Sequence, residues 1–107
     1  MPRLQQGSVV WADLPGSSGR RPVVVLTRDA VVGRLSNVTV APITRTVRNI
    51  NTEVKLQPSD GVPSVCAISL DNIITIDRLR MGDLLTTLNR DVLMQIFNAI
   101  RVAFDMP

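Results

Sequence analysis

A short run of apolar, mostly β-branched residues sets the strongest constraint on the fold. The run Val23–Leu26 contains no polar residue, and a continuous apolar run of this length is typical of a strand that is buried on both faces. Pro22 precedes it, fixes its own φ angle and favours an extended backbone at Arg21. The sequence therefore predicts a central strand over Arg21–Thr27 with a cation at its start.

The loop before this strand is small, hydroxyl-rich and cationic. It contains Ser17 and Ser18 between two glycines, followed directly by Arg20 and Arg21. A guanidinium group carries five donors in a planar fork that matches phosphate oxygens. Two interpretations follow from the residues alone. The segment is either a phosphate-binding loop or an ordinary surface turn with two solvated arginines.

Alternating apolar and polar residues predict an antiparallel sheet around the central strand. The expected strands are Gly7–Leu14, Arg21–Thr27, Asn37–Thr44, Glu53–Gln57, Ser64–Leu70, Ile73–Ile76 and Asp83–Leu88. Residues 28–36 are expected to form a loop or a brief helical turn. Asp77–Met81 is expected to form a helical turn that Gly82 ends.

Asn89 is predicted to cap a helix that runs to about Phe104 and packs its apolar face against the sheet. The predicted class is therefore α+β and mainly β, with a twisted antiparallel sheet that forms a small barrel closed by a C-terminal helix. The 107 residues fit a single domain, 1–107.

Two further polar positions lie at predicted strand ends. Pro42 removes a ladder hydrogen bond, so the end of its strand is expected at an edge or a bulge. Thr44 then leaves the sheet beside Arg45, which gives a second cluster of hydroxyl and guanidinium groups. Asp71 separates two apolar segments, where it is either a turn residue that bonds nearby amides or a functional carboxylate.

The composition excludes several kinds of chemistry. The chain has no histidine and one cysteine, Cys66, so it lacks the usual acid-base residue at neutral pH and the ligands of a zinc site. No metal and no cofactor are expected, and Cys66 is expected to pack as a small hydrophobic residue. Lys55 is the only lysine among twelve basic residues. Trp11, the only tryptophan, is expected to anchor the core or a groove edge rather than stack on a ligand.

No apolar run approaches the roughly 20 residues needed to span a bilayer. The first residues carry one positive charge with no apolar segment behind it, so neither a membrane segment nor a secretory signal is expected. The expected location is the cytoplasm.

Four segments in order, Gly7–Leu14, Gly19–Leu26, Ala41–Thr44 and Asp71–Asp77, together with the C-terminal helix, resemble the MazF/PemK toxins of bacterial toxin-antitoxin systems. The resemblance implies a CcdB-like fold in which the sheet forms a small SH3-like barrel. It also implies a homodimer with a groove for single-stranded RNA and a cognate, MazE-like antitoxin whose flexible tail occupies that groove.

The activity that the resemblance implies is metal-independent, sequence-specific cleavage of single-stranded RNA, as in an mRNA interferase. Arg21 matches the family's catalytic arginine and Thr44 its catalytic threonine, while Asp71 matches a carboxylate that serves as base in the PemK/Kid branch. That branch has an arginine where this chain has Ser69, and a histidine in the first loop that this chain lacks. The Arg-Thr form of the site is therefore the one expected here.

The candidate residues divide by role. Arginine stays protonated at neutral pH, so Arg21 is suited to stabilise charge at the scissile phosphate rather than to act as a base. The residues expected to hold the RNA are Ser17, Ser18, Arg20 and Arg45. The base for the ribose 2′-hydroxyl is unassigned, and Asp71 is a candidate only if it is buried.

Two other functions remain open at this point. One is a CcdB-type poison of DNA gyrase, although that branch relies on a tryptophan-containing C-terminus and this chain ends Ala103–Pro107. The other is a non-cleaving member of the fold that binds only RNA or an antitoxin.

Overall fold

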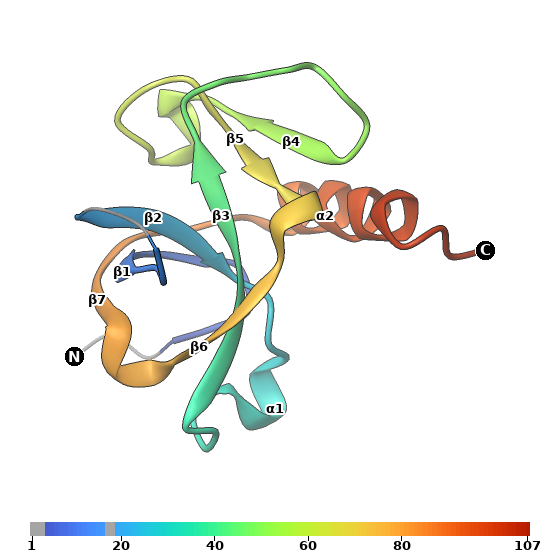
Figure 1. Cartoon of the computed structure of the whole chain (residues 1–107). Coiled ribbons are helices and arrows are strands. Elements are labelled where there is room, and N and C mark those ends of the chain that lie inside the picture. The colour runs from blue at the N-terminus through green and yellow to red at the C-terminus, as the bar shows by residue number, and fades with distance from the viewer. Residues whose placement is uncertain (1–3, 17–18) are drawn as a thin grey trace.

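The computed structural model describes residues 4–16 and 19–107, which form one curled antiparallel sheet with a helix packed at one end (Figure 1). The elements in chain order are β1 (Ser8–Asp13), β2 (Arg20–Val25), α1 (Asp29–Val32), β3 (Asn37–Thr44), β4 (Glu53–Leu56), the 3-10 turn η1 (Pro58–Asp60), β5 (Cys66–Ser69), η2 (Leu70–Asn72), β6 (Ile74–Asp77), η3 (Arg78–Arg80), β7 (Met81–Thr87) and α2 (Arg90–Ala103). None of the helices in the described part of the chain has the length and apolarity needed to cross a membrane.

The long strand β3 organises the sheet because it changes partner along its length. The strand order is β4-β5-β3-β2-β1-β7, with β6 also on β3. The β3 residues Asn37–Val40 pair with β6, whereas Ile43 and Thr44 pair with β5. Pro42 lies between these two stretches, so its missing N–H interrupts neither ladder. The sequence predicts an edge or a bulge at Pro42. The structure instead shows that β3 changes its partner strand there.

The core lies on both faces of the sheet, as the apolar run in β2 predicts. Val23, Val24 and Val25 are each fully buried. Val24 joins the cluster beneath α2, whereas Val23 and Val25 join a second cluster on the opposite face with Val38. Burying a side chain of this size completely contributes about 1.5–3 kcal/mol, so β2 is fixed firmly from both sides.

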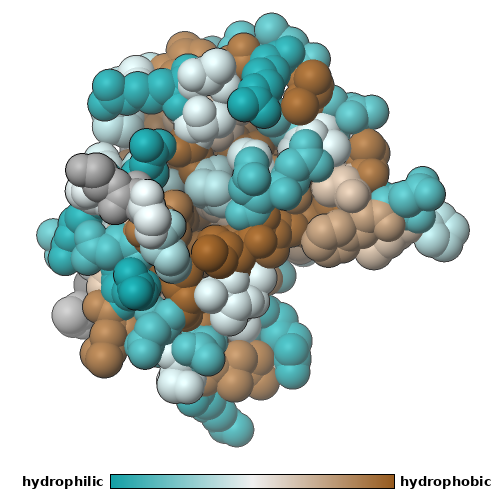
Figure 2. Space-filling view, viewed as in Figure 1, coloured by the Kyte–Doolittle hydropathy of each residue, from teal (hydrophilic) through white to brown (hydrophobic). Residues whose placement is uncertain are grey.

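The predicted start of the C-terminal helix and its packing against the sheet are both confirmed. The Asn89 side chain accepts a hydrogen bond from the Val92 N–H at 3.0 Å and caps α2. Ile96 on the inner face is fully buried against the sheet. Figure 2 shows apolar residues in a band across the viewed face that continues toward α2. Met94 and Phe104 are exposed apolar residues of the C-terminal segment.

The structure differs from expectation at Gly82, which does not end a helical turn. The turn is η3, and Gly82 lies inside β7. The register between β1 and β7 shifts between Val10 and Ala12, so Gly82 and Asp83 together face Trp11. This two-against-one arrangement is a β-bulge, a feature set by cross-strand register rather than by local sequence. Residues 28–36, which were expected to form a loop or a brief helical turn, include the short helix α1.

Candidate functional site

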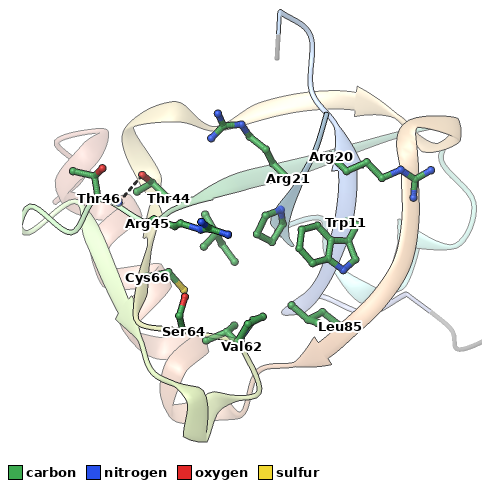
Figure 3. A pocket seen from close by; sticks show the side chains of 13 residues that line it. Trp11, Arg20, Arg21, Thr44, Arg45, Thr46, Val62, Ser64, Cys66 and Leu85 are labelled. Atoms are coloured by element: carbon green, nitrogen blue, oxygen red, sulfur yellow. Dashed lines mark hydrogen bonds between the residues drawn. The ribbon is translucent and has the colours of Figure 1, made fainter. Parts of the chain in front are cut away.

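One pocket brings together residues from both polar clusters of the sequence. It has a volume of about 410 Å³ and is bounded by β1, β2, the end of β3, the connection between β4 and β5, and β7. Arg20, Arg21, Thr44 and Arg45, all expected at the site, contribute to its lining. Figure 3 shows Thr44 and Arg45 on one side of the opening and Arg20 with Trp11 on the other. The two strand ends therefore meet at one cationic site.

Thr44 is the last residue of β3 and is held by its pairing with Ala67 of β5. The Thr46 N–H donates to Thr44 Oγ1 at 3.1 Å. Because this bond uses only one acceptor position of the hydroxyl, the hydroxyl can still donate its own proton. The side chain is half-buried at the pocket wall. Thr44 can therefore donate a hydrogen bond to an anion in the pocket.

Arg21 lies at the rim of the pocket on β2. Its backbone is paired with Ala12 in the β1-β2 ladder, and Pro22 follows it opposite Trp11. The Arg21 side chain is exposed at the opening, whereas Val23–Val25 farther along the strand are fully buried. A cation presented from a rigid strand keeps its position better than one on a long loop. The arrangement suits recognition of phosphate at the mouth of the pocket.

Arg20 lies beside Arg21 in sequence but has different surroundings. Its Nε atom is 3.9 Å from Asp13 Oδ1, and both side chains are about half exposed, at 55% and 52%. An exposed pair of this kind contributes only about 0–1 kcal/mol to stability. Arg80 Nη1 donates to the Asp13 carbonyl oxygen at 3.5 Å on the same edge. The pair orients Arg20 more than it stabilises the fold.

Asp71 lies apart from these residues. It is exposed on η2 and accepts a hydrogen bond from Thr52 Oγ1 at 2.6 Å. It is absent from the pocket lining, and the burial that would make it a candidate base is not found. Its described partner is a hydroxyl 19 residues away in sequence rather than a nearby amide. Ser17 and Ser18 lie outside the described residues.

Apart from Trp11, no residue of the apolar wall of the pocket is signalled by the sequence. Val62 from the β4-β5 connection and Leu85 from β7 approach Trp11 across the opening (Figure 3). Trp11 is half-buried, as expected of a groove-edge anchor. The turn after β4 is recognisable from its prolines and glycine, but only the folded sheet shows that it lies over the site.

Cys66 lines the pocket as a buried free thiol. Burial, with the negative charge of Asp60 as a smaller cause, raises the pKa of the Cys66 thiol. A raised pKa keeps the thiol neutral, and the neutral form is a poor nucleophile. Among the described residues, no three Cys, Asp or Glu side chains gather closely enough to hold a metal ion.

Comparison with known protein families identifies the family to which the chain belongs. Residues 5–104 match the family described as PemK-like, MazF-like toxin of type II toxin-antitoxin system. The chain belongs to the PemK/MazF toxin family. This confirms the family that the sequence resembles. A PemK/MazF chain is expected to have a mainly β fold with a C-terminal helix, and that fold is observed, with the sheet curled rather than closed.

Individual relatives of this PemK/MazF chain come from Mycobacterium tuberculosis. It is 40% identical over 104 residues to the protein named probable endoribonuclease MazF5, covering 94% of this chain and 92% of that one. It is 41% identical over 86 residues to the protein named endoribonuclease MazF3, covering 80% and 84%.

Solved structures agree with the family assignment. The Mycobacterium tuberculosis toxin MazF-mt6 has a TM-score of 0.86 and 37% sequence identity, covering 94% of this chain and 98% of that one. A mycobacterial structure described as an endoribonuclease in complex with its cognate antitoxin has a TM-score of 0.87 and 27% identity, covering 98% of both chains.

Proposed function

We propose that this chain is a toxin endoribonuclease that cuts single-stranded RNA at a short sequence, without a metal ion, and that a cognate antitoxin neutralises it. The observation that carries this proposal is the convergence of Arg21, Thr44 and Arg45 in one pocket. Relatives over most of the chain carry the name endoribonuclease. The relatives therefore favour the ribonuclease over the CcdB-type gyrase poison that the sequence left open.

In the proposed reaction the RNA supplies its own nucleophile. The ribose 2′-hydroxyl, which only RNA carries, attacks the adjacent phosphorus. The new O2′–P bond forms as the P–O5′ bond breaks. The 2′-hydroxyl loses one proton and the leaving O5′ takes up one, so no proton is gained or lost overall. One fragment ends in a cyclic phosphate and the next begins with a free 5′-hydroxyl.

The pocket residues have distinct roles in this reaction. Negative charge builds on the non-bridging phosphate oxygens in the transition state. Arg21 neutralises that charge, and Thr44 donates a hydrogen bond to one of the same oxygens. The backbones of both residues are paired in the sheet at strand ends, which limits the reorganisation needed during the reaction.

The remaining pocket residues hold the RNA chain. Arg45 and Arg20 lie on opposite sides of the opening (Figure 3), where they suit phosphates on either side of the scissile bond. The apolar wall of Trp11, Val62 and Leu85 gives bases a surface that excludes water. Ser17 and Ser18 are proposed to contribute hydroxyls to the backbone contacts.

The family supports a proposal for the partners and the location. We propose a homodimer in the cytoplasm that binds a MazE-like antitoxin across the pocket. The exposed apolar residues Met94 and Phe104 suit a protein interface. The net charge of +3 and the arginines at the pocket favour an acidic partner segment.

A defined long RNA incubated with the protein in EDTA tests this function. The expected result is a set of discrete fragments with free 5′-hydroxyl ends that share a short sequence at every cut. End mapping by primer extension identifies the cuts. RNA that stays intact would contradict the proposal, and intact RNA that the protein nevertheless binds would identify the non-cleaving form of the fold.

Replacing Asp71 with asparagine is expected to leave the initial rate of RNA cleavage within about twofold of wild type. Asp71 lies outside the pocket, and asparagine keeps an acceptor for the Thr52 hydroxyl. A general base contributes about 100- to 10,000-fold to rate, so a loss of that size in Asp71→Asn would show that Asp71 takes the 2′-hydroxyl proton after all.

A further inference from the structure

The space above Gly82 is filled by the guanidinium of Arg20. A Cβ atom built on Gly82 would overlap Arg20 Nη1 and lie 3.1 Å from its Cζ. The same Cβ would lie 3.4 Å from the Trp11 carbonyl oxygen, an ordinary contact. The Arg20 head group therefore rests directly on the backbone of β7 at the bulge.

The backbone at Gly82 does not itself require glycine. Four glycines of the described residues have φ between 75° and 99°, and Gly82 is not one of them. An L-amino acid can therefore adopt this conformation. A side chain at Gly82 would have no space, because the Arg20 guanidinium occupies it.

Arg20 is thus held from two directions. The Asp13 carboxylate lies 3.9 Å from its Nε atom across the β1-β2 ladder, and the bulge at Gly82 receives its Nη1 end. Both contacts place the guanidinium on the side of the opening away from Thr44 (Figure 3). Contacts of this kind limit the rotamers open to Arg20, so less rotamer freedom is lost when it binds a ligand.

We propose that Gly82 is a positioning residue for RNA binding, because it lets Arg20 lie across β7 and contact a phosphate other than the scissile one. The proposal rests on the ribonuclease function and assigns a role within that site. It predicts that Gly82 affects affinity for RNA through Arg20, while the rate of the chemical step depends on Arg21 and Thr44.

Replacing Gly82 with alanine tests this assignment. The probe is a labelled 2′-O-methyl oligonucleotide that carries the sequence around a mapped cut and has no free 2′-hydroxyl. We expect the Kd of Gly82→Ala to rise about tenfold, a typical effect of losing a charge-assisted contact. In cleavage assays KM should rise while kcat stays within about twofold, as expected for a contact made equally in ground and transition states.

Salt dependence gives a second readout that a merely structural change would not move. Each phosphate contact on a single strand contributes about 0.7 to the slope of log K against log salt concentration. The slope of Gly82→Ala should therefore be shallower by about 0.7. Gly33→Ala is the matched control, since Gly33 has φ −78° and no atom within 4 Å of a built Cβ.

A double-mutant cycle with Arg20→Ala decides the mechanism. Removing the Arg20 side chain frees the space above Gly82, so adding Gly82→Ala to Arg20→Ala should change neither the Kd nor the melting temperature further. If Gly82→Ala keeps wild-type affinity, or its effect adds in full to that of Arg20→Ala, the positioning role is wrong while the ribonuclease function stands. If the wild type neither cuts nor binds RNA, both proposals fail.

Discussion

Replacing Arg21 with alanine should lower kcat for RNA cleavage by about 100- to 1,000-fold, the usual effect of removing one donor that stabilises transition-state charge. Arg21 lies at the pocket rim with Thr44, on a strand in which Val23–Val25 are fully buried. Since its side chain is exposed, the substitution should leave the fold intact. Initial rates on an oligonucleotide with one mapped cut would measure the loss.

Two variants control for charge and shape. Arg34→Ala removes an exposed arginine next to the C-cap of α1, away from the pocket, and should cleave at the wild-type rate. Arg21→Lys keeps the charge but loses the planar fork, so it should fall between wild type and Arg21→Ala. Cleavage by Arg21→Ala at the wild-type rate would remove Arg21 from the mechanism.

Arg21 and Arg20 are adjacent in sequence, and the structure separates their expected effects. Arg21 shares the pocket rim with Thr44, whereas Arg20 reaches across to the bulge in β7. Substitution of Arg21 should therefore act on kcat and substitution of Arg20 mainly on KM. The two arginines are expected to differ in role because successive residues of a strand face different neighbours.

Local patterns were sufficient to predict most of the fold. Strand β3 was predicted to the residue, because its alternation and its ends at Asn37 and Thr44 are clear in the sequence. The helix cap at Asn89 was also predicted, since capping depends on the residue itself. The bulge at Gly82 and the change of partner at Pro42 depend on strands distant in sequence, so local patterns do not predict them.

In the candidate site, too, local sequence predicts some features, whereas others depend on segments that are distant in sequence. Arg21, Thr44 and Arg45 meet because two predicted strands end side by side, and strand ends are recognisable. Asp71 is also at a strand end, but η2 turns it outward to Thr52, a direction that the sequence does not specify. The apolar wall depends on the fold of the β4-β5 connection over the pocket, which is a long-range contact.

In the proposed reaction the substrate's own 2′-hydroxyl is the nucleophile. The most direct test is a pair of oligonucleotides with the sequence of a mapped cut. One is RNA with a single 2′-deoxynucleotide on the 5′ side of the scissile phosphate, and the other is DNA with a single ribonucleotide at that position.

The mechanism requires one hydroxyl at one position and no metal ion. We therefore expect no cleavage of the RNA with the single deoxynucleotide, and cleavage of the DNA at its one ribonucleotide to give a cyclic phosphate, both in EDTA. Cleavage of the deoxy-substituted RNA at the same phosphate would contradict the account, because the nucleophile would then come from water or from the protein.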